Sequence, residues 1–205
     1  MTAPDASISA WITGLVGKAP AFDWLMSVFV SDYFLPVIAF LVLIALWFGT
    51  RDLSRREPNQ RAVFCAATGA GFTALAVWVL NHAFHLDPWP RPCDLAAHIP
   101  SARHAAETLF YWPTDPSFPS NAAAVLFALA LGMWFTNRKA GAVLFALACL
   151  WSFARVYCGV HYPLDIVGGA AIGFVVSYVV YKGLWPVVEP VLALIFKWTK
   201  RLYLS

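Results

Sequence analysis

The strongest constraint on this chain is a series of apolar stretches that are as long as a bilayer is thick. Two of them, residues 34–48 and 140–153, contain no charged side chain. Of the 205 residues, 60% are hydrophobic and 12% are charged, so a water-soluble fold would have to enclose these runs on every side. A soluble protein is therefore the weaker alternative. We expect an all-α integral membrane protein, with residues 1–205 in a single membrane-embedded domain.

The hydropathy pattern predicts a bundle of about five to six transmembrane helices, preceded by a short amphipathic N-terminal helix in the interface. This first helix should cover residues 7–16, which are too few to span. Crossings are expected at about residues 24–48, 62–84, 120–135, 140–157 and 163–181. A last helix at 187–196 contains Glu189 and Pro190, and basic residues follow it. It therefore fits the cytoplasmic face better than a sixth crossing.

Basic residues give the expected orientation, because cytoplasmic loops are enriched in Lys and Arg. The loop at 51–61 carries four arginines, and the turn at 137–139 carries two more cations. Of the 14 Lys and Arg residues, four fall on the outer side of this topology: Lys18, Arg91, Arg103 and Arg155. The net charge of +3 is small and no long basic tract occurs, so the bilayer is an expected partner and nucleic acid is not.

A polar constellation follows the fourth predicted crossing. Arg155, His161 and Asp165 are separated by six and four residues, and Pro163 marks the first turn of the next helix. His161 should therefore lie at the amino end of that helix, with Asp165 one turn further on the same face. The carboxylate can then hold one ring nitrogen while the other faces a substrate, and Arg155 can offer a forked donor to phosphate oxygens.

Two more segments of the chain offer phosphate ligands. Pro119, Ser120 and Asn121 open the third predicted crossing, and a helix amino terminus with a small hydroxyl residue binds phosphate readily. Arg91 precedes Pro92 in the long outer connection and supplies a second guanidinium. The predicted topology brings all of these groups to the outer side of the membrane.

These residues resemble the type 2 phosphatidic acid phosphatase superfamily, whose three motifs are Lys-x6-Arg-Pro, Pro-Ser-Gly-His and Ser-Arg-x5-His-x3-Asp. Arg91 and Pro92 match the end of the first motif and Ser120 the start of the second. The third motif is matched by Arg155, His161 and Asp165. Within the superfamily, residues 117–121, residues 155–165 and the amphipathic N-terminal helix are similar to the bacitracin-resistance type of undecaprenyl pyrophosphate phosphatase.

The resemblance implies a mechanism and a substrate. His161 would attack phosphorus to form a phosphohistidine, Asp165 would orient the ring, and the substrate-binding residues would be Arg91, Pro92, Ser120, Asn121 and Arg155. No metal or cofactor is implied. The substrate would be a polyprenyl pyrophosphate, undecaprenyl pyrophosphate, which is converted to undecaprenyl phosphate so that the cell-wall carrier lipid is recycled. The enzyme would be a multi-pass protein of the bacterial inner (plasma) membrane, with its active site on the periplasmic side.

Three positions depart from the motifs. Ala122 stands where the superfamily has the general-acid histidine, so the chain as written is expected to be impaired. Phe84 replaces the lysine of the first motif and Ala154 the serine of the third. An engineered substitution is the favoured explanation of Ala122, and a natural pseudoenzyme is the alternative.

Other interpretations remain open. The chain could be a broader lipid phosphatase or phosphotransferase acting on phosphatidic acid or phosphatidylglycerol phosphate, or a non-catalytic protein that binds polyprenyl phosphates. The oligomeric state does not follow from the sequence. Cys93 and Cys158 flank the proposed site as two thiols or as a pair, with thiols favoured. An outer metal cluster is disfavoured because its candidate ligands match no compact metal-binding spacing. Those candidates are His82, His85, Asp87, Asp94, His98, His104 and Glu107.

Overall fold

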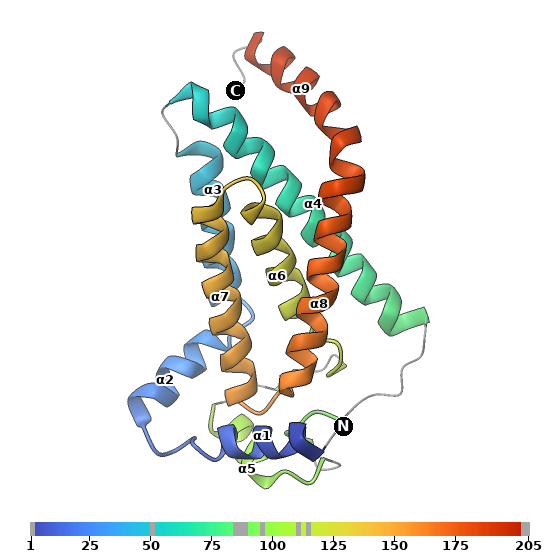
Figure 1. The fold of residues 1–205 in the computed structure, drawn as a ribbon. Helices are drawn as coiled ribbons and strands as arrows, with labels where there is room; N and C mark the ends of the chain where they lie inside the picture. Colours follow the sequence, from blue (N-terminus) through green and yellow to red (C-terminus); the bar gives the residue numbers. More distant parts are fainter. Residues whose placement is uncertain are drawn as a thin grey trace.

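The computed structural model describes residues 3–49, 52–83, 90–94, 97–109, 112–113 and 116–201, and the regular structure within these ranges is entirely helical. The long helices lie side by side, and two short helices, α1 and α5, lie across one end of the bundle (Figure 1). The expected all-α fold is confirmed. The elements are α1 (Ala3–Thr13), α2 (Pro20–Phe29), α3 (Phe34–Phe48), α4 (Leu53–Ala83), α5 (Pro100–Thr108), α6 (Asn121–Trp134), α7 (Arg138–Tyr157), α8 (Pro163–Val179), the π-helical turn η2 (Val180–Leu184) and α9 (Trp185–Arg201).

Three helical stretches of the described chain are long and apolar enough to cross a membrane: Arg55–His82, Arg138–Tyr157 and Pro163–Leu194. The pair α2 and α3 passes the same test when it is taken together, which gives up to four spans. Helix α6 is apolar but has only 14 residues. The chain is thus a multi-pass membrane protein, as expected. The described residues offer three or four candidate spans where about five to six were predicted, and the helix boundaries differ from those predicted.

The first predicted crossing is the clearest difference. Instead of one helix over 24–48, α2 and α3 meet at an angle of 57°. Pro36 explains the break, because a helical proline has no N–H to bond the carbonyl four residues earlier and its ring collides with that carbonyl. That carbonyl belongs to Asp32, which lies in the break itself.

The two cytoplasmic predictions also need correction. Most of the expected polar loop at 51–61 is helical, because α4 begins at Leu53. Arg61 stabilises the first turns of α4 by pairing with Glu57 at 2.6 Å, at the i,i+4 spacing that favours a helix. It also pairs with Glu189 of α9. The last helix is not set apart from the fifth predicted crossing, because the helical path continues from α8 through η2 into α9 without a break.

Helix α6 lies at the centre of the bundle, where it packs against α4, α7 and α8 (Figure 1). Two glycines of α8 permit its close approach. A Cβ atom added at Gly169 would lie 2.4 Å from the Ser120 carbonyl oxygen. One added at Gly173 would lie 2.3 Å from the Ala124 carbonyl oxygen. The α6–α8 contact is therefore made by backbone, and it fixes the amino end of α6 against the amino half of α8.

Helix α1 turns its polar side toward the protein. Asp5, Ser9 and Thr13 are buried, whereas Ile8 and Trp11 are exposed. Asp5 accepts a hydrogen bond from the Leu164 backbone N–H at 3.2 Å, at the start of α8. An amphipathic N-terminal helix is present as predicted, but it covers Ala3–Thr13 instead of residues 7–16. Its exposed apolar side chains face away from the bundle, as suits a helix at a membrane interface.

Candidate phosphate-binding and catalytic site

A tight turn between α7 and α8 carries the central histidine. Gly159 adopts a φ of +73°, and a Cβ atom there would lie 2.5 Å from the Ala102 carbonyl oxygen of α5, so glycine is needed for both reasons. The Val160 N–H closes the turn on the Arg155 carbonyl at 3.1 Å. His161 follows directly and is 1% exposed.

Asp165 holds one side of the imidazole. Its Oδ2 lies 3.4 Å from His161 Nδ1, and the same oxygen accepts the Tyr162 backbone N–H at 2.8 Å. Ser117 donates its hydroxyl to this oxygen at 2.6 Å. Because a carboxylate oxygen only accepts, we assign the ring proton to Nδ1, which leaves the Nε2 lone pair directed away from Asp165.

Two donors lie on the other side of the ring. Ser120 Oγ and Arg91 Nη1 are each 3.4 Å from His161 Nε2. Burial lowers the pKa of His161 to about 4; the charges of Arg155 and Arg91 also lower it, whereas the hydrogen bond with Asp165 raises it. The imidazole is therefore neutral at neutral pH, and Nε2 can act as a nucleophile toward a group bound by these donors.

Arg91 is held by hydrogen bonds within the connection between α4 and α5. Its Nη1 donates to the Val160 carbonyl at 2.6 Å and its Nη2 to the Pro116 carbonyl at 3.2 Å. Its own backbone N–H donates to Asp94 Oδ2 at 2.6 Å. Pro92 is buried in the following turn and has no side-chain donor, so any contribution to binding comes from the shape of that turn.

Ser120 caps α6 and joins it to the start of α8, next to the turn that carries His161. Its Oγ accepts the Ala123 N–H at 3.4 Å, and its own N–H donates to the Asp165 carbonyl at 3.1 Å. The positive end of the α6 dipole thus lies next to His161. A helix terminus in this position favours an anion.

Arg155 forms the wall of an adjacent pocket of about 320 Å³. Its side chain is 4% exposed, and its guanidinium donates from Nη1 to Asp32 Oδ1 at 2.8 Å and lies 5.1 Å from the centre of the Trp151 ring. Asn121 and Ala122 line the same pocket. The structure thus brings the residues of all three sequence segments into one region, and the Ala122 side chain borders open space.

Residues 62–189, which make up more than half of the chain, match the PAP2 superfamily. The chain belongs to the PAP2 superfamily. It is 30% identical over 172 residues to undecaprenyl-diphosphatase BcrC of Bacillus subtilis (strain 168), covering 83% of this chain and 79% of that protein.

Two solved structures have the same PAP2 fold. The crystal structure of Aquifex aeolicus LpxE superposes with a TM-score of 0.59 at 25% identity, over 88% of this chain and 96% of that one. A transmembrane PAP2-type phosphatidylglycerolphosphate phosphatase from Bacillus subtilis gives a TM-score of 0.54 at 20% identity, over 88% and 86% of the two chains.

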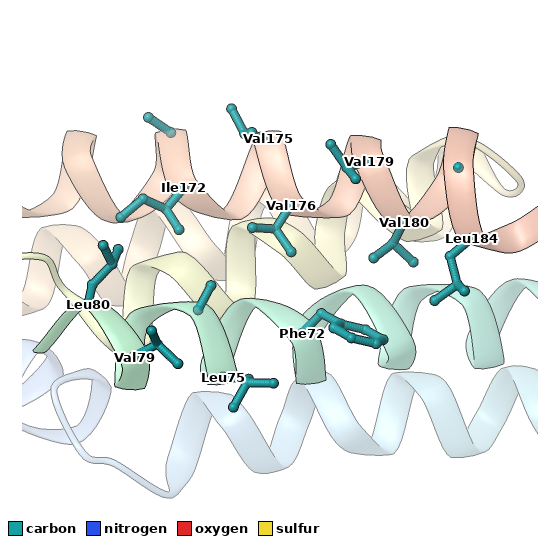
Figure 2. A pocket seen from close by; sticks show the side chains of 13 residues that line it. Phe72, Leu75, Val79, Leu80, Ile172, Val175, Val176, Val179, Val180 and Leu184 are labelled. Atoms are coloured by element: carbon teal, nitrogen blue, oxygen red, sulfur yellow. The ribbon is translucent and has the colours of Figure 1, made fainter. Parts of the chain in front are cut away.

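A large groove of this PAP2 chain lies apart from the polar site. It has a volume of about 1040 Å³ and runs between α4 and the α8–η2 helix, with apolar side chains on both walls (Figure 2). Phe72 and Leu75 line one wall, and Val175 and Val179 line the other. Among the described residues that line it there is no acid, base or nucleophile, so the groove is an apolar surface of the kind that faces lipid.

Two residues of the PAP2 site were not assigned a role from the sequence. Ser117 is buried against Asp165, and the available signal for it was its place at the start of the 117–121 segment that carries the family resemblance. Asp32 approaches Arg155 from the break between α2 and α3, outside the matched region, and its acidic side chain within an apolar stretch was the available signal.

The remaining candidates near the PAP2 site are thiols and scattered loop residues. Cys93 and Cys158 are buried free thiols, and burial raises the pKa of Cys158 to about 12. In the parts of the chain that the structure describes, no three His, Cys, Asp or Glu side chains gather as metal ligands. Phe84, His85 and Asp87 lie outside the described residues.

Proposed function

We propose that this chain has the site of an undecaprenyl-diphosphatase, which converts undecaprenyl pyrophosphate to undecaprenyl phosphate through a phosphohistidine at His161. The observation that carries the proposal is the arrangement of the ring, with Nδ1 next to Asp165 and Nε2 next to Arg91 and Ser120. The similarity to undecaprenyl-diphosphatase BcrC supports this substrate.

The proposed reaction has two displacement steps. First, the Nε2 lone pair of His161 attacks the terminal phosphorus, and the bond to the bridging oxygen breaks, so undecaprenyl phosphate leaves. Water then attacks the phosphorus of the phosphohistidine, the P–N bond breaks and orthophosphate is released. Arg91, Arg155 and the α6 terminus would stabilise the charge on the phosphoryl oxygens during both steps.

Ala122 is where this scheme is incomplete. The departing oxygen needs a proton in the first step, and the water must lose one in the second, but an alanine methyl group can do neither. We therefore propose that turnover is impaired in the chain as written. The pocket beside Ala122 supports the interpretation that an imidazole is missing, because a histidine at this position could extend into it.

The substitution Ala122→His tests the function. Release of orthophosphate from undecaprenyl pyrophosphate should rise by about 10²- to 10⁴-fold, the usual contribution of a general acid or base. Ala122→Leu is the control that fills space without transferring a proton, and it should stay inactive. His161→Asn in the Ala122→His background should abolish both turnover and the acid-labile phosphorylated protein.

The same assay separates the alternative functions. A revertant that prefers phosphatidic acid or phosphatidylglycerol phosphate would indicate a broader lipid phosphatase. A revertant that binds polyprenyl phosphates but never forms a phosphoenzyme would indicate a binding protein. The first result would reject the proposed substrate, and the second would reject the proposed chemistry.

We place the site on the periplasmic face of a bacterial plasma membrane. The proposal is supported by the basic residues Arg138 and Lys139, which open α7 at the end opposite Arg155. A membrane-impermeant reagent that modifies a cysteine introduced next to the site in intact cells would test the orientation.

A further inference from the structure

The break between α2 and α3 is attached to α7 by two side chains on successive helical turns. Trp151 donates its indole N–H to the Val30 carbonyl at 3.3 Å. Arg155, four residues later, donates to Asp32 Oδ1 at 2.8 Å. The interruption of the helix therefore supplies both a backbone acceptor and a carboxylate to the face of α7 that borders the polar pocket.

The charge of Arg155 gives this contact its importance. The Arg155 side chain is 4% exposed, and its cation needs a nearby negative charge, because an isolated buried cation is costly. Asp32 supplies that charge from a side chain that is 53% exposed. The carboxylate thus reaches a buried cation from the accessible side of the pocket.

The two contacts also restrict the direction of the guanidinium. The group is planar and carries five N–H donors in a fixed fork. Contact with Asp32 at Nη1 and with the face of Trp151 limits rotation of the plane. Asn121 and Ala122 lie around the same pocket, so the orientation of the plane decides which N–H groups an anion there can meet.

We propose that Asp32 is a positioning residue, which orients Arg155 so that it can bind the substrate phosphate. The inference rests on the proposed function and adds to it a residue that lies outside the region matched to the PAP2 superfamily. In this role Asp32 does not touch the phosphate. The opposite possibility is that Asp32 competes with phosphate for Arg155, and the two ideas predict changes of opposite sign.

Binding of orthovanadate, a phosphate-shaped anion, tests the inference without turnover. The full chain with Ala122, purified in detergent, is titrated by calorimetry. Asp32→Ala should weaken binding by about 10- to 100-fold, as expected when a charge-assisted contact is lost. Asp32→Asn, which keeps an oxygen acceptor, should fall between this variant and the parent, and Asp32→Glu should retain most of the affinity.

A double-mutant cycle shows whether Asp32 acts through Arg155. Arg155→Ala should weaken orthovanadate binding, and adding Asp32→Ala to it should cause no further loss. Asp52→Ala is the matched control, because Asp52 pairs with the exposed Arg55 at 3.5 Å and should leave binding unchanged when removed. Thermal unfolding of every variant reports any loss of folded protein, and Asp32→Asn carries the comparison if Asp32→Ala does not fold.

The outcomes separate this inference from the function on which it rests. Tighter binding by Asp32→Ala, or a further loss in the Arg155→Ala background, would overturn the positioning role. Unchanged binding by Asp32→Ala, with weaker binding by Arg155→Ala, would overturn the inference alone. If Arg155→Ala itself binds normally, the proposed phosphate site fails and the inference fails with it.

Discussion

Gly169→Ala is the substitution whose effect the structure defines most sharply. The new Cβ atom would lie 2.4 Å from the Ser120 carbonyl oxygen, whereas ordinary van der Waals contact begins at 3.4 Å. The Ser120 backbone must therefore move by about 1 Å or α8 must shift, and overpacking of this kind costs about 1–3 kcal/mol of stability. Ser120 Oγ is 3.4 Å from His161 Nε2, at the outer limit of a hydrogen bond, and we expect the displacement to lengthen this distance.

The functional cost follows from the loss of an anion donor. A hydrogen bond to a charged group contributes about 1.5–3 kcal/mol, which corresponds to a loss of about 10- to 100-fold in orthovanadate affinity. Gly173→Ala is the matched control, since its Cβ atom would lie 2.3 Å from the Ala124 carbonyl oxygen, about one turn away from the site. It should lose similar stability while its orthovanadate affinity stays within about threefold of the parent.

Calorimetric titration and thermal unfolding of both variants measure the two effects separately. The reasoning is refuted if both variants are equally destabilised and both keep parental affinity, because the position of Ser120 would then not matter to the anion. It is also refuted if Gly169→Ala unfolds at the parental temperature, since the close contact would then carry no cost.

Two further predictions concern the His161–Asp165 pair in the Ala122→His revertant. Ser117→Ala removes the 2.6 Å hydrogen bond to Asp165 and should lower kcat about tenfold with little change in KM. Ser27→Ala, which removes an exposed hydroxyl, is the control. If the Ser117→Ala and Ser27→Ala variants have the same kcat, Ser117 does not have this role. Because burial lowers the pKa of His161 from 6.5 to about 4, the ring protonates only as the pH falls toward 4. The rate of phosphoenzyme formation, followed by rapid quench, should therefore not fall between about pH 7 and pH 5, whereas an acid limb near 6.5 would show that the ring is not buried as described.

The sequence predicted the part of the site that depends on local spacing. Pro163 indicated a helix start, and Asp165 lies four positions after His161, so the spacing predicted that the two side chains would approach each other. In the structure His161 lies in the turn just before the N-cap residue Tyr162, and Asp165 reaches back to it from the first turn of α8. The membrane class followed from the apolar stretches, because few folds other than a helical bundle can satisfy such segments.

The parts that were missed depend on contacts between distant segments. Asp32 meets Arg155 across 123 positions, and Ser117 meets Asp165 across 48. No local pattern encodes either pairing, since it follows only when the helices are packed. The break beside Asp32 could have been predicted from Pro36, but average hydropathy over 24–48 concealed a single proline within an otherwise apolar run.

The unequal lengths of α6 and α7 have a consequence for how the pocket could change. Helix α6 has 14 residues and its antiparallel neighbour α7 has 20, so α7 extends about 9 Å further at 1.5 Å per residue. This overhang carries Arg155 past the level of Ala122 and creates a recess. Inserting four residues into α6 would move Ser120 by about 6 Å along the helix axis, toward the level of Arg155, and rotate it by about 40° about that axis. The longer helix would then fill the recess. Insertions and deletions in this hairpin should therefore alter the depth of the site more than any single replacement of a side chain.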